Sequence, residues 1–252
     1  MTIDYPTSAQ LPQLRALWKA AFGDEDNFLD TFYSIAYSPE RCRCLELEGR
    51  IAAALYWFEC TCDGARFAYI YGVATDPAFR GRGLCRTLME DARNILKNQD
   101  FDGIILYPAS ESLSRMYAKM GYTRCTSVSE FTCAAAEEAE PLFLVEKDEY
   151  AALRRMLLPE GGMIQDREDL DLLASQAAFF AGSGILAAVT VMDGKLHCHE
   201  LLGNLTAAPK IVKSLGCKTG FFRTPGDEKP FAMYLPLNEN CPKPSYFGLA
   251  LD

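Results

Sequence analysis

The chain has 252 residues, of which 49% are hydrophobic and 23% are charged, and its formal net charge is −9. This composition is close to the average for globular proteins, and the length suffices for one large domain or two ordinary ones with a buried core. The negative charge excludes a bulk attraction to nucleic acid or to an anionic membrane surface, and it slightly favours cationic partners such as amines. We therefore expect neither nucleic acid nor a membrane as a partner.

Residues 1–11 contain no basic segment and no apolar run, so no signal peptide is visible there. The longest apolar stretch, residues 177–192, is interrupted by Gly182 and Gly184 and is too short to cross a membrane. These observations predict a cytoplasmic protein whose ten cysteines remain reduced.

Four of the cysteines form two Cys-x-Cys pairs, Cys42 with Cys44 and Cys60 with Cys62. Residues two apart on a strand share a face, so one reading is that the four thiols meet at a zinc ion. The two-residue spacing of a zinc knuckle is absent, however, and small apolar cysteines in a sheet are the simpler reading. We therefore expect no metal site.

The first half of the chain alternates helical and strand patterns. Apolar residues recur at helical spacing over residues 8–22, where Ser8 is a suitable N-cap, and an acidic segment from residue 24 opens a shorter helix. Asp63-Gly64 is typical of a two-residue hairpin turn. The other expected elements, in chain order, are strands at 43–47, 51–60 and 66–75, a helix at 84–97, a strand at 101–107, a helix at 110–120 and a strand-like segment at 122–133.

An Ala/Glu-rich stretch at 134–140, followed by Pro141, divides the chain into predicted domains 1–135 and 142–252. The second half repeats the order of the first: strand, Asp-Gly turn, strand, helix, strand. This order suggests a duplicated α/β unit. The expected elements are a helix at 149–158, strands on both sides of the turn at 193 and 194, a helix at 207–215, and strands at 219–223 and 231–235.

The most informative segment is a glycine-containing loop between a strand and a helix. The strand ends at Thr75, and Arg80-Gly81-Arg82-Gly83 leads directly into a helix that begins near residue 84. Glycines let the backbone N–H groups turn toward one point, and those groups lie at the positive end of the helix. Such a loop suits a pyrophosphate, and its arginines add positive charge. The patterns of a P-loop and of a dinucleotide fingerprint are both absent.

The loop resembles motif A of the GNAT superfamily, R/Q-x-x-G-x-G/A, with Cys85 in place of the usual last glycine or alanine. The resemblance implies an acyl-CoA-dependent N-acyltransferase that uses acetyl-CoA as co-substrate. It further implies that the backbone of residues 81–86 holds the pyrophosphate and that the strand ending at Thr75 pairs with the pantetheine arm. The cofactor-binding residues expected on this basis are Val73, Ala74, Thr75, Arg80, Gly81, Arg82, Gly83, Leu84, Cys85, Arg86 and Ser112.

A second match lies downstream, where the segment 116–122, M-Y-A-K-M-G-Y, resembles the family's Y-x-x-x-G-F/Y helix end. The resemblance implies that Tyr117 is catalytic and protonates the departing CoA thiolate, a role that suits a phenol. The alternative is that Tyr117 only packs in the core as a helical aromatic. The asparagine usual between these motifs is absent, with Ser110 or Ser112 nearby.

The resemblance covers about the first 135 residues, and with it comes an expected fold. That fold is α/β (α+β): a mixed, mostly antiparallel, twisted sheet flanked by helices. The second half lacks the R-x-x-G-x-G pattern and is expected to be a smaller, degenerate GNAT-like domain. Tandem arrangements of one active and one silent unit are known in this superfamily, including relatives of the enhanced intracellular survival proteins, of which residues 110–122 are reminiscent.

The residue that accepts the proton of the amine cannot be read from the sequence. Tyr71 stands where some family members place a glutamate, and the acids at 24–26 lie where the substrate-facing helices begin, although helix capping also explains them. His197 and His199 share one strand face, which an ordinary half-buried strand explains equally well. The apolar residues 246–251 are expected to hold the tail so that the terminal carboxylate, on Asp252, faces the cleft, as in some tandem members.

The expected function is the transfer of an acetyl group from acetyl-CoA to a primary amine of a small-molecule or peptide acceptor, by direct attack in a ternary complex. A catalytically silent acyl-CoA-binding or regulatory module is the alternative, because the asparagine is missing and Cys85 is unusual. A fatty-acyl transferase on the same fold is a third reading. The sequence leaves the acceptor, the acyl chain length and the oligomeric state open, and a homodimer is compatible with it.

Overall fold

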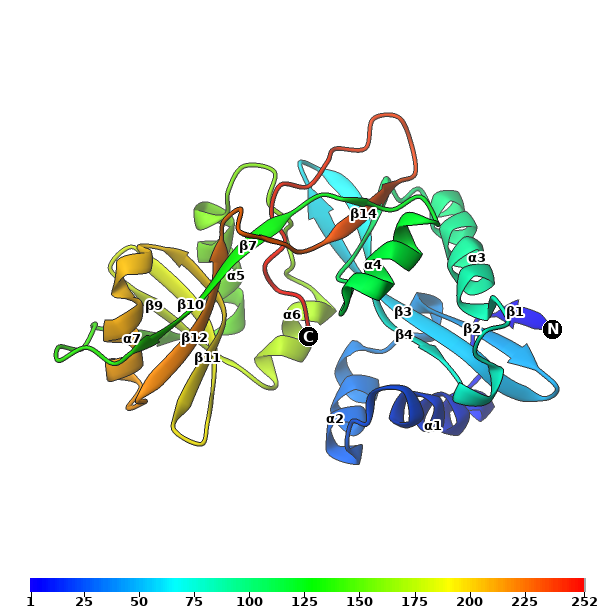
Figure 1. Cartoon of the computed structure of the whole chain (residues 1–252), viewed down its shortest axis with the longest axis horizontal. Helices are drawn as coiled ribbons and strands as arrows, with labels where there is room; N and C mark the ends of the chain where they lie inside the picture. Colours follow the sequence, from blue (N-terminus) through cyan, green and yellow to red (C-terminus); the bar gives the residue numbers. More distant parts are fainter. Residues whose placement is uncertain (252) are drawn as a thin grey trace.

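Two seven-stranded mixed sheets, one for each half of the molecule, lie side by side in the computed structural model, which describes residues 1–251 (Figure 1). The first sheet has the order β1 (Thr2–Asp4), β2 (Cys42–Leu47), β3 (Arg50–Cys62), β4 (Ala65–Thr75), β5 (Gly103–Leu106), β14 (Met233–Pro236) and β6 (Thr123–Arg124). The second has the order β13 (Lys229–Pro230), β7 (Ser127–Ala134), β12 (Thr219–Pro225), β11 (Lys195–Gly203), β10 (Ile185–Met192), β9 (Ala178–Gly182) and β8 (Phe143–Val145). The mixed α/β architecture expected from the sequence is confirmed.

Helices flank both sheets. In chain order they are α1 (Leu11–Phe22), α2 (Asp26–Thr31), α3 (Leu84–Asn98), α4 (Glu111–Ala118), α5 (Lys147–Leu157), α6 (Glu168–Ala174) and α7 (Ala208–Ser214). Short 3-10 turns occupy Ser8–Gln10, Pro39–Arg41, Pro77–Phe79 and Leu205–Ala207, and a π-helical turn, Phe32–Ala36, follows α2. Thr7, rather than the expected Ser8, precedes the first turn and donates its backbone N–H to Oε1 of Gln10 at 2.9 Å. None of the helices in residues 1–251 combines the length and the apolar character needed to cross a bilayer.

The two halves share one connectivity. In the first, β3 and β4 form an antiparallel hairpin at Asp63-Gly64, and α3 carries the chain across to β5, which pairs in parallel with β4. In the second, β10 and β11 form a hairpin at Asp193-Gly194, and α7 leads to β12, which is parallel to β11. Both turns have the left-handed φ values that a two-residue hairpin requires. The duplication inferred from the sequence is therefore present in the topology.

Each sheet takes one strand from the other half. The chain leaves the first sheet after β6, and β7 then pairs with β12 of the second sheet; β14 returns to lie between β5 and β6. The sheets therefore do not divide at the predicted boundary between residues 135 and 142. Segment 127–134, expected in the first domain, lies in the second sheet, and segment 233–236 does the reverse, because hydrophobic pattern does not specify which sheet edge a strand joins.

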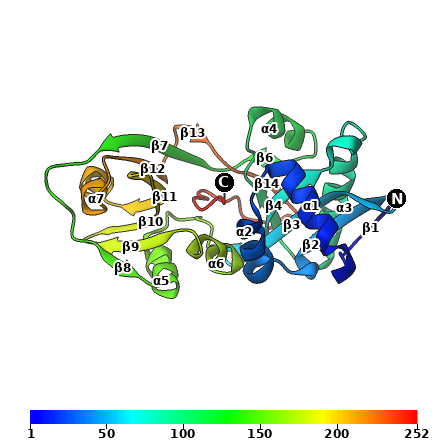
Figure 2. The ribbon, with the colours of Figure 1, turned by 90° about the horizontal axis from the view of Figure 1, so that it is seen from below.

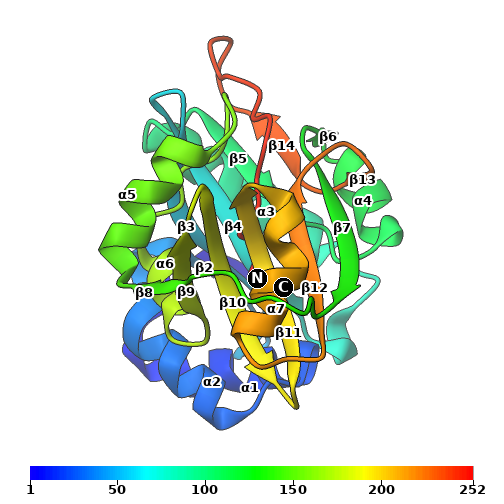
Figure 3. The ribbon, with the colours of Figure 1, turned by 90° about the vertical axis from the view of Figure 1, so that its left-hand side faces the viewer.

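Three hydrophobic cores hold this arrangement. One lies between the first sheet and α3 and α4, and another lies beneath α7 on the outer face of the second sheet (Figure 3). The third is shared, because it joins side chains of α1, β3, α5, α6, β9 and the C-terminal tail. Figure 2 shows α2 and α6 close together at the junction of the halves, where α6 packs on the turn that follows α2.

The two Cys-x-Cys pairs lie at different positions along the first sheet. On β2, Cys44 pairs with Ala54 of β3, whereas Cys60 is six residues further along β3 and pairs with Phe67. At about 3.4 Å per residue, roughly 20 Å of strand separates these two positions. Among residues 1–251, no three His, Cys, Asp or Glu side chains are grouped to hold a metal ion.

Candidate active site

The site begins where two parallel strands separate. β4 and β5 pair from Phe67 and Gly103 as far as Ile70 and Leu106. β5 ends there, whereas β4 continues to Thr75, so among the described residues no strand pairs with the last residues of β4 on that side. Two pockets open at this separation, and Val73 lines both of them.

A bulge in β4 shapes the same segment. The pairing of β3 with β4 shifts register between Ala54 and Tyr56, opposite Gly72. Gly72 has φ of 60°, and a Cβ built there would lie 2.7 Å from Cζ3 of Trp18, so glycine is required both for conformation and for space. A bulge leaves a residue outside the hydrogen-bond ladder, and here that places Gly72 and Val73 in the wall of a pocket.

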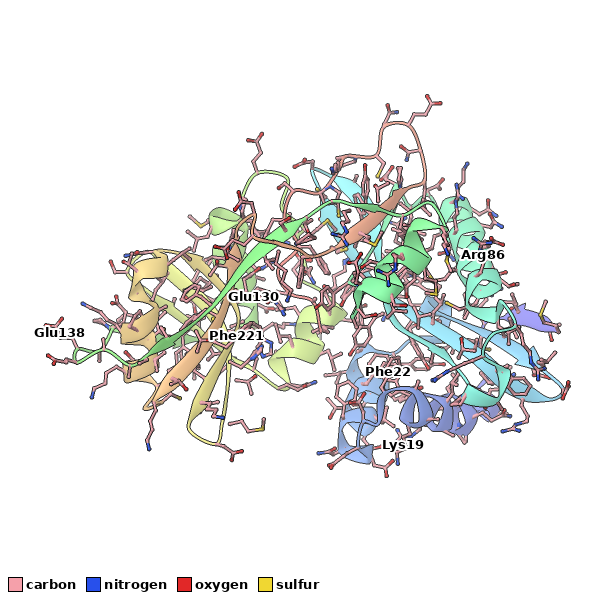
Figure 4. All side chains as sticks on the ribbon, viewed as in Figure 1. Lys19, Phe22, Arg86, Glu130, Glu138 and Phe221 are labelled. Atoms are coloured by element: carbon pink, nitrogen blue, oxygen red, sulfur yellow. The ribbon has the colours of Figure 1, made fainter. Side chains whose placement is uncertain are left out.

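The larger pocket is a groove of about 650 Å³ between the end of β4, the start of α3 and α4, which we call the cofactor groove. Figure 4 labels Arg86, one of the residues that line it, in α3. Its lining residues are Ala21, Phe22, Val73, Ala74, Thr75, Phe79, Arg80, Gly81, Gly83, Leu84, Cys85, Arg86, Leu113, Met116, Tyr117, Lys119 and Met120. The structure thus brings together all of the predicted cofactor-binding residues except Arg82 and Ser112.

The loop before α3 has the geometry of an anion cradle. Gly81 and Gly83 have φ of 76° and 78°, and a Cβ at either would meet no protein atom within 4 Å, so open space faces both. Among residues 1–251, no acceptor is found for the backbone N–H groups of residues 81–86, whereas the Gly83 carbonyl already accepts from the N–H of Thr87 at 3.1 Å. Unpaired N–H groups at a helix N-terminus bind phosphate oxygens, so this loop fits the pyrophosphate of CoA.

Two arginines that line the cradle donate hydrogen bonds to backbone carbonyl oxygens of neighbouring segments. Arg80 donates from Nε to the carbonyl oxygen of Thr75 at 3.1 Å, and Arg86 donates from Nη2 to that of Lys119 at 2.9 Å. Arg82 instead extends outward, with its guanidinium 5.2 Å from the centre of the Phe79 ring, so it lies outside the groove.

The helix geometry of α4 explains why Ser112 lies outside the groove. Ser112 is exposed, whereas Leu113, one residue further around the helix, lines the groove. Ser110 is the N-cap of α4, and its Oγ accepts from the N–H of Leu113 at 3.2 Å. The asparagine expected by resemblance therefore has no serine substitute here. Cys85 does line the groove, where burial raises the pKa of its thiol.

Tyr117 stands at the junction of the two pockets. Its side chain is 6% exposed and packs edge-on against Tyr122 at 5.8 Å between ring centres, yet it borders both pockets. Burial raises the pKa of Tyr117 well above the ordinary value of 10.0, so the phenol stays protonated at physiological pH and is available as a donor. Tyr117 therefore packs in the core and also borders both pockets, and its catalytic role stays a prediction.

The second pocket, of about 370 Å³, lies between the two halves, and we call it the amine pocket. Most of its wall is aromatic or aliphatic. It is lined by Trp18, Phe22, Asp24, Phe28, Tyr69, Ile70, Tyr71, Gly72, Val73, Leu106, Tyr107, Ala109, Leu113, Tyr117, Leu172, Leu173, Gln176, His199, Ala250 and Leu251. Sequence reasoning missed α6 and the segment directly after it, which supply Leu172, Leu173 and Gln176. It also missed Phe22, which lies at the end of α1, is exposed and lines both pockets.

Asp24 is the one carboxylate among the residues that line the amine pocket in the described part of the chain. Its Oδ2 accepts from Nε1 of Trp18 at 2.7 Å, which fixes the carboxylate at the pocket wall. Glu25, not Asp24, is the N-cap residue of α2. Asp26 pairs with Lys19 at 2.6 Å on the surface, so the three neighbouring acids have different surroundings.

The C-terminal tail forms part of the same wall. The N–H of Leu251 donates to the hydroxyl of Tyr69 at 3.2 Å, and the Leu249 carbonyl accepts from Nε2 of the buried Gln165 at 2.7 Å. Gly248 packs directly against the carboxylate of Glu200, which the buried Arg154 holds through two hydrogen bonds of 2.6 and 2.9 Å. Asp252, whose carboxylate was expected to face the cleft, lies outside the described residues.

The equivalent region of the second half is closed. Gly203 at the end of β11 has φ of 88°, and a Cβ there would lie 2.0 Å from the carbonyl oxygen of Gly184. The turn that follows has no glycine, and Asn204 caps it by accepting from the N–H of Thr206 at 3.1 Å. The second half therefore repeats the topology without repeating the cradle.

Comparisons with known proteins agree with this fold. The family model described as an acetyltransferase (GNAT) domain matches residues 2–125. A GCN5-related N-acetyltransferase from Anabaena variabilis ATCC 29413 is similar, with a TM-score of 0.73 at 16% identity, over 94% of this chain and 73% of that one. Eis1 from Mycobacterium abscessus has a TM-score of 0.68 at 12% identity, over 94% and 74%. A tandem GNAT protein from the clavulanic acid biosynthesis pathway has 0.60 at 13% identity, over 95% and 100%.

At these identities the likeness to solved structures shows the fold, and the family model adds the sequence evidence for the first half. No curated protein sequence matches the chain. Together with the two repeated sheets, these findings identify residues 2–125 as an acetyltransferase (GNAT) domain and give the whole chain the fold of the GNAT structures to which it is similar.

Proposed function

We propose that this protein transfers an acetyl group from acetyl-CoA to a primary amine of a small-molecule or peptide acceptor, by direct attack in a ternary complex. The observation that carries the proposal is the position of Tyr117, which borders both the cofactor groove and the amine pocket. The sulfur of the departing CoA thiolate would lie between the two pockets. The phenol of Tyr117 at their junction is in position to donate a proton to it.

Acetyl-CoA, when bound, supplies the activated acetyl group. The N–H groups of residues 81–86 bind the pyrophosphate, and the unpaired edge of β4 from Val73 to Thr75 offers backbone groups to the amide-bearing arm. The same edge provides N–H donors for the oxygen that becomes negative during attack. Tyr117 holds the proton at its phenol oxygen that the departing thiolate requires.

On the acceptor side, the pocket favours a cationic amine that is then deprotonated. Asp24 provides the negative charge, and the aromatic walls around it exclude water and so strengthen the attraction. We propose Asp24 as the group that orients the ammonium and accepts its proton. The chain's net charge of −9 favours the approach of cations in the same way.

The decisive test compares Tyr117→Phe with wild type by measuring CoA release over a panel of primary amines. We expect kcat to fall by roughly 100-fold or more, the usual contribution of a general acid, with little change in the KM for acetyl-CoA. Tyr122→Phe is the matched control, because it removes a buried hydroxyl that has no partner among the described residues from a ring that lines neither pocket. Its kcat should stay at the wild-type value.

Equal activity of Tyr117→Phe and wild type would contradict the assigned role. Binding of acetyl-CoA without release of CoA on any amine would favour the silent acyl-CoA-binding module instead. Failure to bind acetyl-CoA would remove both functions.

A further inference from the structure

A third pocket, on the open face of the second sheet, continues from the amine pocket. It measures about 700 Å³ and shares two wall residues with the amine pocket, Gln176 and His199. The remaining lining residues are Thr132, Thr190, Met192, Asp193, Lys195, Leu196, His197, Thr219, Gly220 and Phe221. Neither the family model, which ends at residue 125, nor the cofactor groove includes any of these residues.

A bulge in β11 gives the shared wall its shape. The pairing of β10 with β11 shifts register between Ala188 and Val189, and His199 is the extra residue on β11. His199 and His197 lie on the open face, whereas Cys198 between them is buried in the core beneath α7.

Hydrogen bonds fix the junction of the two pockets. Nε2 of His199 lies 2.9 Å from Oγ1 of Thr190, which in turn donates to the carbonyl oxygen of Gln176 at 3.2 Å. These three residues tie β10, β11 and the end of α6 together where the pockets meet. Hydrogen bonds therefore hold these side chains in place where the two pockets meet.

Beyond the junction, the rings of His197 and Phe221 stack on each other across the neighbouring strands β11 and β12. The rings of His197 and Phe221 lie nearly parallel, 4.9 Å apart at 23°, and the His199 ring is 4.6 Å from that of His197. Figure 4 labels Phe221 in the second half and Phe22 in the first, and these residues line the two connected pockets.

The groups around the ring pair indicate the chemistry of the ligand. Hydroxyls of Thr132, Thr190 and Thr219 surround the rings, and the one lysine and one aspartate that line the pocket cancel in charge. A planar ring can stack on the outer face of this ring pair, and hydroxyl and imidazole groups both donate and accept hydrogen bonds. The pocket therefore suits an uncharged planar ring that carries hydrogen-bonding atoms.

We propose that this pocket is the subsite for the far end of the acceptor. The amine end lies in the amine pocket near Asp24 and Tyr117, and a planar, hydrogen-bonding ring at the other end stacks on the outer face of the His197–Phe221 pair. The inference rests on the proposed acetyl transfer, because it extends the same acceptor site. It assigns the second half of the chain a role in acceptor selection.

The kinetic test uses acceptors of graded length on the intact chain: propylamine, a long unbranched alkylamine and an alkylamine of matched length that ends in a phenol. His197→Ala and Phe221→Ala should raise the KM for the phenol-ended amine about 3- to 10-fold, the loss expected for one stacking contact, with kcat unchanged. Their kcat/KM for propylamine should equal that of wild type. Phe143→Ala, which removes an exposed phenylalanine on edge strand β8, is the matched control and should change neither value.

A binding readout separates this inference from the proposed function. The chain has two histidines; His197 lines this pocket and not the amine pocket, whereas His199 lines both, so the His197 imidazole resonances report on the subsite. Adding the phenol-ended amine should shift both resonances, and adding propylamine should shift His197 far less. Unmoved resonances, or variant effects that are equal for short and long amines, would overturn the subsite. Shifted resonances without acetylation of any amine would keep the subsite and reject acetyl transfer.

Discussion

Residue by residue, neighbouring acids in this chain have different chemistry because their partners differ. Asp24 accepts from the Trp18 indole at the wall of the amine pocket, whereas Asp26, two residues further, pairs with Lys19 in solvent. A hydrogen-bonded carboxylate within an aromatic wall attracts a cation more strongly than a solvated one, because fewer water molecules screen it. Position relative to α1, and not residue type, therefore selects Asp24.

Asp24→Asn should reduce kcat/KM for small amines by roughly 10- to 100-fold, the loss expected for a hydrogen bond to a charged group. The amide oxygen still accepts from the Trp18 indole, so the fold should persist. Asp26→Asn is the control and should retain wild-type kinetics. Steady-state kinetics with propylamine checks both, and an unchanged kcat/KM for Asp24→Asn would reject the role of Asp24.

Asp169 in α6, unlike the solvent-exposed Asp26, is buried and lies beneath the C-terminal tail. Burial raises its pKa from 3.8 to about 6, although the N–H groups of Leu170 and Arg167 donate to its Oδ1. Its Oδ2 and the Oε1 of nearby Gln165 are both buried without a hydrogen-bond partner among the described residues. The folded state thus binds the proton more tightly than the unfolded chain does, so stability falls as pH rises from about 4 to 6.

Asp169→Asn removes this penalty, which amounts to about 3 kcal/mol for a shift of roughly two pKa units. The amide keeps the two acceptor bonds and adds a donor beside Gln165. We expect the variant to exceed wild type in unfolding free energy by about 1–3 kcal/mol at pH 7.5, with the difference shrinking toward pH 4. Urea unfolding at pH 4.5, 6 and 7.5 measures this, and a destabilised variant at every pH would contradict it.

At the scale of elements, the site depends on where strands and helices end. The cofactor groove exists because β5 stops at Leu106 while β4 continues to Thr75, and because the N–H groups of the loop from Gly81 to Gly83 have no acceptor among the described residues. The equivalent loop before α7 is capped by Asn204 and lacks that opening. Two copies of one connectivity therefore differ in binding because of a few loop residues.

Gly83→Ala tests the loop. Alanine at φ of 78° costs roughly 1 kcal/mol of strain, and its methyl group would enter the groove. Gly49→Ala is the matched control, since Gly49 has φ of 75° and equally open surroundings on the β2–β3 turn. A hundredfold excess of acetyl-CoA over its Kd should stabilise wild type and Gly49→Ala by about 2–3 kcal/mol in a thermal-shift assay. At the same concentration it should stabilise Gly83→Ala by far less; equal stabilisation of both variants would contradict the assigned cradle.

The sequence predicts the local parts of the site best. The loop at 80–86 is continuous in the chain, and its glycines and helix start are visible without tertiary information. Side-chain direction is harder, since Ser112 and Leu113 are neighbours in sequence but about 100° apart around α4. The amine pocket is hardest, because it forms between α1, α6 and the tail, which meet only in the folded molecule.

On the scale of the whole molecule, the two halves are held as one unit. Thr61 of β3 and Ile164 exchange backbone hydrogen bonds of 3.1 and 2.8 Å across the junction, and Arg167 pairs with Glu59 at 2.8 Å. The shared core and the two exchanged strands add to this connection. A pocket between halves that are fixed in this way is preformed and does not require closure.

The exchange of β7 and β14 between the two sheets predicts that residues 1–135 do not fold alone, because β5 loses its pairing with β14 from Gly103 to Leu106. Fusing residues 1–125 to residues 231–240 through a short glycine–serine linker should restore folding, since the N–H of Cys125 already donates to the carbonyl of Ala232 at 3.1 Å. Circular dichroism distinguishes the two fragments. A cooperative thermal transition for residues 1–135 would contradict the prediction.

The exchange of β7 and β14 also has a consequence during synthesis. Domains usually fold in the order in which they leave the ribosome. Here residues 127–230, which complete the second sheet, emerge before residues 233–236, which complete the first. The later half of the nascent chain can therefore finish its sheet first, and the first half must wait, with β5 still lacking β14 as a partner, until residues 233–236 have left the ribosome.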